Sequence, residues 1–198
     1  MRSSVRTFTI GAVVMLALSS HAPMTLAGTD RTPSAPPEQT YCVVEASPAG
    51  GKVAARAVAP QCFGSFAAAV SFATDGTVRL PWTATEVSQA QLDAGRAEDR
   101  LASTVIGIEY EHTSFGGTEW IIAQASGCND GGAEVWLRSD LTGTAMNNTI
   151  SSARTYGGCK SRHFEHANFG GSSYLCGCSQ MGTMSDKTTS IRWSASGF

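Results

Sequence analysis

The chain has 198 residues, with 14 Lys and Arg against 16 Asp and Glu, and a formal net charge of −2. This balance argues against the basic surface that a nucleic-acid or anionic-membrane partner requires, so neither partner is predicted. The length allows one good core, or a small domain attached to a medium one.

Residues 1–27 have the layout of a secretory signal peptide. Arg2 and Arg6 precede an uncharged apolar run from Phe8 to Leu18, and small residues then lead to Gly28. The run is too short for a membrane helix, which needs roughly 20 apolar residues, and no later segment offers them. We therefore expect a soluble, secreted extracellular protein, with a net charge of about −4 once the two arginines are removed.

Residues 28–40 are predicted to be a disordered leader, because prolines and polar residues leave little to bury. Residues 41–103 are predicted to form a small α/β region that begins with a strand at Tyr41–Glu45. A second strand is expected at Lys52–Val58, across a turn rich in proline and glycine.

Two helices are expected in the same region. Apolar residues recur at helical spacing from Phe63 to Ala73, and Gly76 can end that helix. The second helix is predicted to begin at Thr83, which has capping-box spacing to Glu86, and to run toward Leu101. Nothing in this region indicates catalysis.

Beyond residue 103 short runs rich in Val, Ile, Tyr, Phe and Trp alternate with glycine turns, which indicates β-structure. One phrase occurs twice there, as YEHTSFGG at 110–117 and FEHANFGG at 164–171. Each copy is followed by a second shared phrase, MNNTISSAR at 146–154 and MSDKTTSIR at 184–192. A paired repeat means two copies of one supersecondary unit. The first copy carries an insertion of about 16 residues, in or near 126–142.

The first phrase resembles the Greek-key motif of the βγ-crystallin superfamily: aromatic, four residues, aromatic, one residue, glycine. The matching positions are Tyr110, Phe115 and Gly117 in the first copy and Phe164, Phe169 and Gly171 in the second. In a folded hairpin one aromatic packs over the turn, and the glycine adopts a conformation that other residues avoid. The resemblance implies a mainly β, two-motif Greek-key sandwich at 104–198, and an α+β protein overall.

The pattern Glu-His-x-x-Phe-Gly-Gly, together with a signal peptide and extra cysteines, is most similar to exported actinobacterial crystallin-fold proteins. The metalloproteinase inhibitor family is among these. The resemblance covers only the C-terminal half of the chain and does not explain residues 41–102.

The second phrase resembles the calcium signature of the same superfamily: two Asn/Asp, two free positions, Ser/Thr, then Ser. Residues 147–152 match completely, whereas Ser185 replaces Asn or Asp in 185–190. The superfamily shares each site between its motifs, which implies as ligands the side chains of Asn148, Asp186, Ser151 and Thr189 and the carbonyls of Thr149 and Lys187. With one formal carboxylate, affinity should be in the range of roughly 10⁻⁴ to 10⁻³ M. In the alternative interpretation Ser152 and Ser190 hydrogen-bond the hairpins, and no ion is bound.

Six cysteines, Cys42, Cys62, Cys128, Cys159, Cys176 and Cys178, most simply form three disulfides in an oxidising compartment. Cys42–Cys62 would tie the first strand to the start of the first helix. For the others we favour Cys159–Cys176 across the second hairpin and Cys128–Cys178, although the two other pairings stay open. Cys176-Gly-Cys178 lacks the spacing of common zinc or redox motifs, so it is interpreted as structural.

Glu111-His112 and Glu165-His166 invite a catalytic interpretation. Each pair holds the same repeat position, however, and one active site seldom needs two separated copies, so we interpret both as structural. A metal shared by His163 and His166 is disfavoured because the residues between them already have motif roles. No nucleophile elbow, zinc-protease helix or phosphate loop occurs, so no enzyme is predicted.

Two functions remain as expectations. The first is a secreted, disulfide-stabilised binding module that holds Ca²⁺. The alternative is an inhibitor of a secreted metalloproteinase, which would present the segment 126–142, anchored by a cystine at Cys128. Fold does not fix function, so the residues alone do not decide between them. The oligomeric state is not indicated, and a monomer is favoured.

Overall fold

The computed structural model describes residues 39–49, 59–128 and 135–197. The predicted signal peptide, most of the predicted leader and the predicted strand at 52–58 lie outside the described residues. No helix among the described residues is long and apolar enough to cross a membrane.

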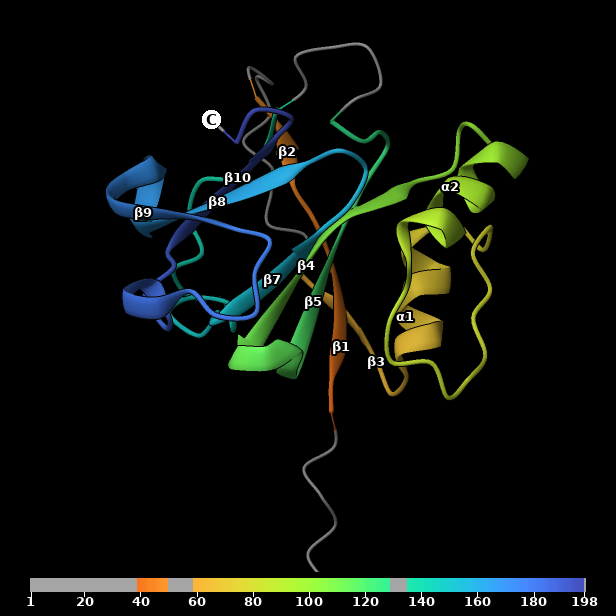
Figure 1. The fold of residues 1–198 in the computed structure, drawn as a ribbon, viewed down its shortest axis with the longest axis horizontal. Helices are drawn as coiled ribbons and strands as arrows, with labels where there is room; N and C mark the ends of the chain where they lie inside the picture. Colours follow the sequence, from red (N-terminus) through yellow and green to blue (C-terminus); the bar gives the residue numbers. More distant parts are fainter. Residues whose placement is uncertain (1–38, 50–58, 129–134, 198) are drawn as a thin grey trace, which may run out of the picture. The chain divides into compact units, whose positions relative to one another are not determined.

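The strands are β1 (Tyr41–Glu45), β2 (Ser47–Pro48), β3 (Gln61–Phe63), β4 (Thr104–His112), β5 (Gly116–Gln124), β6 (Val135–Arg138), β7 (Ser152–Thr155), β8 (Lys160–His166), β9 (Gly170–Cys176) and β10 (Ser190–Ser194). The helices are α1 (Phe66–Ala73) and α2 (Gln89–Glu98). One sheet has the order β3-β1-β5-β4-β7 and the other the order β2-β6-β10-β8-β9. Figure 1 shows the helices on the side of the first sheet that faces away from the second sheet.

The two repeats exchange a segment. Each repeat begins with a hairpin, β4–β5 or β8–β9, whose first strand also pairs with a later strand, β7 or β10. The strand β6 of the first repeat crosses to the second sheet and pairs with β10. In return, residues 178–181 of the second repeat bond to β7, where Ala153 N donates to Cys178 O at 3.0 Å. The predicted mainly β sandwich of two motifs is confirmed.

The first sheet is buried on both faces. One core lies between the sheets and includes Trp193, Trp120 and Ile122. The other lies between the first sheet and the helices and includes Phe66, Val70 and Leu92. Burial on both faces explains why the first seven residues of β4, 104–110, are all buried instead of every second one.

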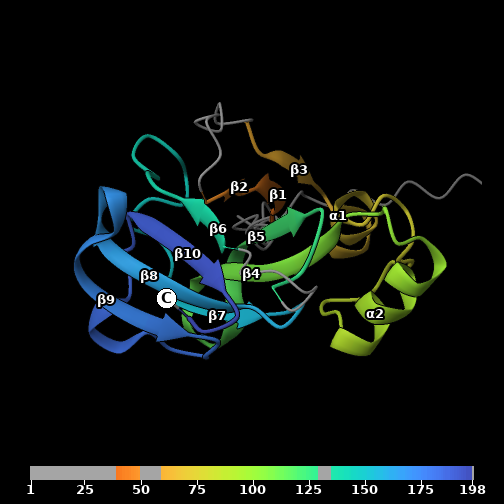
Figure 2. The ribbon, with the colours of Figure 1, turned by 90° about the horizontal axis from the view of Figure 1, so that it is seen from above.

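The region before residue 104 supplies strands to both sheets. The strand β1 lies between β3 and β5, antiparallel to the former and parallel to the latter, and four of its five residues are buried. The strand β2, which follows β1 along the chain, pairs with β6 of the second sheet. The predicted boundary at residues 103 and 104 therefore falls between strands that share the first sheet, as Figure 2 also shows.

The first predicted helix forms and the second begins later than predicted. Helix α1 is capped at its start by Ser65. Beyond its last residue, Gly76 has φ +80°, and its N–H donates to Ser71 O at 2.8 Å. Helix α2 begins at Gln89, capped by a reciprocal box of Ser88 and Gln91. The predicted start at Thr83 is wrong because the chain before the helix is held elsewhere. Val87 is buried, and its carbonyl accepts a bond from Tyr156 Oη at 3.1 Å.

Three disulfides form, but only one has the predicted pairing. Cys42–Cys62 joins residues that lie directly opposite in β1 and β3. The other two are Cys128–Cys159 and Cys176–Cys178, so the predicted Cys159–Cys176 and Cys128–Cys178 pairings are wrong. The register places Ser161 opposite Cys176. Cys159 is instead drawn to Cys128, whose N–H bonds Gly157 O at 2.8 Å.

We predict that residues 104–198 do not fold without the preceding region. Removing it strips β1 from the middle of the first sheet and exposes the buried outer face that carries Val105, Ile108 and Ile121. Circular dichroism should show a cooperative thermal transition for a chain that starts at residue 39 and none for one that starts at 104. A cooperative transition of the shorter chain would make the C-terminal half a separate domain.

Candidate functional site between the two repeats

Both copies of the first phrase form the same folded hairpin. Phe115 and Phe169 each have φ 64°, and the glycines two residues later have φ +78° and +74°. A Cβ on Gly117 would lie 2.8 Å from that of Glu111, so both space and backbone conformation require glycine there. The paired aromatics meet edge to face, with ring centroids 5.3 Å apart for Tyr110 and Phe115.

The last serine of each second phrase ties the hairpin down. Ser152 Oγ accepts from Phe115 N at 3.1 Å and donates to His112 O at 2.6 Å. Ser190 does the same for Phe169 N at 3.0 Å and His166 O at 2.7 Å. These two serines are fully buried, and their hydrogen-bonding capacity is used within the fold. They stabilise the hairpins, as one interpretation of the sequence expected.

The Glu-His pairs also belong to the hairpins. Glu111 Oε2 accepts from Thr118 N at 2.9 Å, and Glu165 Oε2 accepts from Ser172 N at 3.3 Å. Hydrogen bonds from Thr118 lower the pKa of Glu111, because they favour the charged carboxylate. Each glutamate therefore closes its own hairpin.

The side chains of the predicted calcium ligands meet in two pairs. Each pair joins one residue of the first repeat to one residue of the second. Ser151 Oγ donates to Asp186 Oδ1 at 2.8 Å, and Thr189 Oγ1 donates to Asn148 Oδ1 at 3.3 Å. Asn148 and Asp186 are both exposed and have left-handed backbones, with φ 56° and 59°. The positions of Thr149 and Lys187, whose carbonyls are the remaining predicted ligands, directly follow these two residues.

Backbone bonds hold these loops against each other. Asn148 N donates to Thr188 O at 2.9 Å, and Asp186 N donates to Ile150 O at 3.0 Å. Each loop thus fixes the other, and both Asx side chains are placed beside a hydroxyl of the opposite repeat. Positions that are three residues apart in the phrase come together only because the two copies face each other.

The oxygen sets fit a hard cation. Ca²⁺ takes oxygen ligands at roughly 2.3–2.6 Å, so adjacent ligand oxygens in its shell lie about 3 Å apart. The two crossed pairs have oxygens at 2.8 and 3.3 Å. A further oxygen in the same loop, Asn147 Oδ1, is buried without a hydrogen-bond partner. The described residues contain no group of three or more His, Cys, Asp or Glu side chains that could hold a metal.

A buried acid and a buried base, which no sequence motif indicated as a pair, meet between the sheets. His163 Nε2 lies 2.8 Å from Glu109 Oε2, and both side chains are completely buried. They precede the first aromatic of each phrase, so they occupy equivalent repeat positions. This equivalence, with an acid in one copy and a base in the other directly before the motif aromatic, is the signal that could have found them. Glu109 Oε1 and His163 Nδ1 have no partner.

Glu119 is a second buried acid, under the helical layer. Its side chain is 2% exposed, Oε1 accepts from Gln39 Nε2 at 3.0 Å, and Oε2 has no partner. Burial raises the pKa of Glu119 to about 8, although the Arg154 charge opposes the shift. The carboxyl is therefore mostly protonated in the folded protein at neutral pH.

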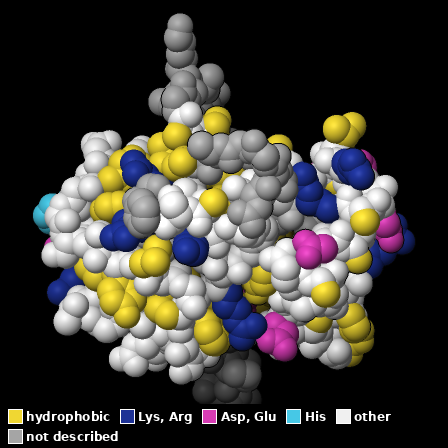
Figure 3. Space-filling view, turned by 45° about the horizontal axis from the view of Figure 1, so that its top comes forward, with side chains coloured by type: hydrophobic (Ala, Val, Ile, Leu, Met, Phe, Trp, Pro, Cys, Tyr) yellow, Lys and Arg dark blue, Asp and Glu magenta, His cyan; other side chains and the backbone are white. Residues whose placement is uncertain are grey.

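The insertion of the first repeat is only partly described. Residues 129–134 lie outside the described residues, and Val135–Arg138 forms β6, paired on both sides with β10 and β2. Cys128 before it is buried and disulfide-bonded. On the face drawn in Figure 3 the basic side chains are scattered among uncharged and apolar ones and form no continuous patch outside the grey atoms.

No protein-family model and no curated protein matches the chain. Several solved structures are similar to about half of it. An archaeal βγ-crystallin has 24% identity over 44% of this chain and 95% of its own, with a TM-score of 0.32. A βγ-crystallin domain from Clostridium beijerinckii has 19% identity over 46% and 98%, with a TM-score of 0.34. A clostrillin double mutant in complex with nickel has 20% identity over 46% and 99%, also at 0.34.

We predict that Glu119→Gln stabilises the protein at pH 8 and changes little near pH 4.5. The folded-state pKa of about 8 exceeds the ordinary 4.5. Stability therefore falls by about 1.4 kcal/mol per pH unit between these values, because only the unfolded chain ionises. Glutamine removes this cost and keeps the acceptor for Gln39.

Urea unfolding from pH 4.5 to 8.5 tests this prediction. The control Glu111→Gln should act in the opposite sense, because the pKa of Glu111 is lowered and its charged form stabilises the fold above pH 4.5. A Glu119→Gln protein less stable than the parent at pH 8 would contradict the prediction.

Proposed function

We propose that the protein is a secreted, disulfide-stabilised binding module that holds Ca²⁺ in two sites, each shared by the two repeats. The observation that carries this proposal is the pair of crossed contacts, Ser151 with Asp186 and Thr189 with Asn148. Each contact would form one site. The carbonyl of Thr149 or Lys187 would add a further oxygen to it.

Burial supports a role for these oxygens beyond turn formation. The motif serines, Ser152 and Ser190, already close the hairpins from fully buried positions. Asn148 and Asp186 are exposed at the surface in left-handed conformations, where their oxygens remain within reach of an ion from solvent. Asparagine and aspartate accept that conformation better than other residues with side chains.

The two sites should differ in strength. The site at Asp186 contains a carboxylate, whereas the site at Asn148 contains only neutral oxygens. Ca²⁺ affinity depends on ligand charge and site rigidity, and extracellular modules of this kind bind at roughly 10⁻⁴ to 10⁻³ M. The Asp186 site should therefore fill first.

We predict that Ca²⁺ raises the melting temperature of the full chain, and that Asp186→Asn weakens this effect. Asparagine keeps the conformation and the hydroxyl contact but removes the charge. At 100 times the dissociation constant one site adds about 2.7 kcal/mol of stability. Asp140→Asn is the matched control, because that exposed carboxylate accepts only a local bond from Thr142 N at 2.8 Å.

Calorimetric titration and thermal melting with millimolar CaCl₂ measure both effects. Absence of heat and of any melting shift would remove the calcium proposal. Equal loss of affinity in Asp140→Asn and Asp186→Asn would show that the effect is one of general charge.

A second candidate is inhibition of a secreted metalloproteinase by the segment 126–142. The observation in its favour is that both described ends of the segment are fixed, by the Cys128–Cys159 disulfide and by the pairing of β6 with β10. Fixed ends lower the conformational entropy that a segment loses when it enters a cleft. We predict inhibition of at least one thermolysin-like protease, and uniform failure across a panel of extracellular proteases would exclude this function.

A further inference from the structure

Of the three disulfides, Cys176–Cys178 contributes least as a clamp. It joins cysteines with a sequence separation of 2, whereas the separations of the other two are 20 and 31. In the chain-entropy account a disulfide stabilises by restricting the unfolded chain, and the effect grows with the loop that it closes. A three-residue loop restricts the unfolded chain very little.

Hydrogen bonds that do not involve the sulfurs hold the surrounding backbone. Ser161 Oγ donates to Cys176 O, at the end of the β8–β9 pairing. Ala153 N donates to Cys178 O, and Met181 N donates to Ser151 O, both at 3.0 Å. This backbone can therefore stay in place whether the two sulfurs are joined or reduced.

The two sulfurs differ in access. Cys176 is 1% exposed and belongs to the core between the sheets. Cys178 is partly exposed, between the exposed residues Gly177 and Ser179. An incoming thiolate can therefore reach Cys178, and the sulfur of Cys176 would be the leaving group. Access decides which sulfur is attacked in thiol–disulfide exchange.

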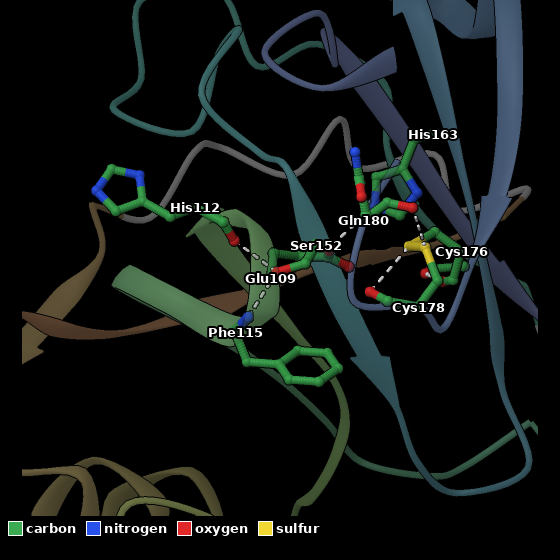
Figure 4. Close-up of a disulfide and its surroundings, with 9 residues drawn as sticks. Glu109, His112, Phe115, Ser152, His163, Cys176, Cys178 and Gln180 are labelled. Carbon is green, nitrogen blue, oxygen red and sulfur yellow. Dashed lines mark hydrogen bonds and ion pairs between the residues drawn. A yellow bond between two sulfur atoms is a disulfide. The ribbon is translucent and has the colours of Figure 1, made fainter. Parts of the chain in front are cut away.

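The leaving sulfur has a buried histidine close by. His163 is opposite Tyr174, and Ser161 is opposite Cys176, so His163 and Cys176 are diagonal neighbours on β8 and β9. Figure 4 shows His163 and Glu109 in the surroundings of the disulfide. The Nδ1 atom of His163 has no hydrogen-bond partner, while Nε2 contacts Glu109 Oε2 at 2.8 Å. An oriented imidazole is thus available near the sulfur that would carry negative charge.

The strand that leads to the disulfide is open to a peptide. The second sheet ends with β9, which both Figure 1 and Figure 2 place on the side opposite the helices. Tyr174 and Leu175 on this strand are 41% and 42% exposed. An extended segment can add to such an edge through backbone hydrogen bonds, which would bring its cysteine to the end of β9.

We propose that Cys176–Cys178 is a thiol–disulfide exchange site that oxidises pairs of cysteine thiols in extended peptide segments. A peptide thiolate attacks Cys178 Sγ, the Cys176–Cys178 bond breaks, and Cys176 Sγ leaves as a thiolate that takes up a proton. The second peptide thiolate then attacks the peptide sulfur of the mixed disulfide, and Cys178 leaves. The peptide loses two electrons and forms a disulfide, and the cysteine pair becomes a dithiol. A low-molecular-mass disulfide such as oxidised glutathione restores it.

Redox equilibration of the full-length protein in glutathione buffers tests the chemistry. Alkylation and mass spectrometry should find Cys176 and Cys178 reduced at ratios of reduced to oxidised glutathione that leave the other two pairs oxidised. Reduction of all three pairs together, or of Cys176–Cys178 last, would overturn the proposal. This measurement uses the unaltered protein, so it does not depend on the folding of a variant.

A synthetic peptide with two cysteines tests the substrate class. One equivalent of protein should oxidise about one equivalent of peptide without added oxidant. Cys178→Ser should lower the initial rate at least about tenfold, whereas the double variant Cys128→Ser, Cys159→Ser should retain the rate if circular dichroism shows a fold.

Leu175→Ser separates docking from chemistry. It should slow the reaction with the peptide severalfold and leave the reaction with reduced glutathione unchanged, since glutathione does not need the edge of β9. An unreactive parent protein, or a Cys178→Ser protein that reacts as fast as the parent, would refute the exchange site. Equal slowing with both thiols in Leu175→Ser would refute the peptide specificity.

Discussion

Reciprocal hydrogen bonding between the two repeats is the constraint on which the rest of the structure depends. Neither repeat completes its own sheet, because β6 leaves the first repeat for the second sheet and residues 178–181 return to β7. The bonds that fix Asn148 to Thr188 and Asp186 to Ile150 follow the same reciprocal rule. A side chain on one repeat is therefore positioned by the backbone of the other, and any site near this contact has contributions from both.

This reciprocity explains what could be predicted from the sequence. The hairpins are local, because an aromatic, a glycine and a serine at fixed spacing dictate their geometry, as Phe115, Gly117 and Ser152 do in the first copy. Residues brought together by long-range contacts have no local signature. Cys128 reaches Cys159 through a backbone contact at Gly157, and β1 enters the first sheet through a parallel pairing with β5. Parallel pairing between distant segments has no turn that would reveal it.

The start of α2 shows a different limit. Thr83 with Glu86 and Ser88 with Gln91 have the same capping spacing, and local chemistry does not choose between them. Tertiary contacts decide, since Glu86 is paired with Arg154 at 2.9 Å and Val87 is buried beneath Tyr156. Glu119 and Tyr110 are buried on the face of the first sheet that the helices cover. The shifted pKa of Glu119 thus depends on the region before residue 104.

Duplication helps to separate structural from functional residues. The hairpins themselves use the features that both copies share. These features are the serine hydrogen bonds, the glutamate hydrogen bonds and the arginines that lie 4.2 and 5.0 Å over Phe115 and Phe169. Where the copies diverge, the hairpin makes no demand. Glu109 against His163, Asn148 against Asp186, and Cys178 in the segment that corresponds to β6 are such places. The Cys176–Cys178 disulfide lies beside the acid–base pair that this divergence created. Selection for the hairpin alone accounts for neither, so their proximity is the strongest reason to test that corner of the sandwich for chemistry.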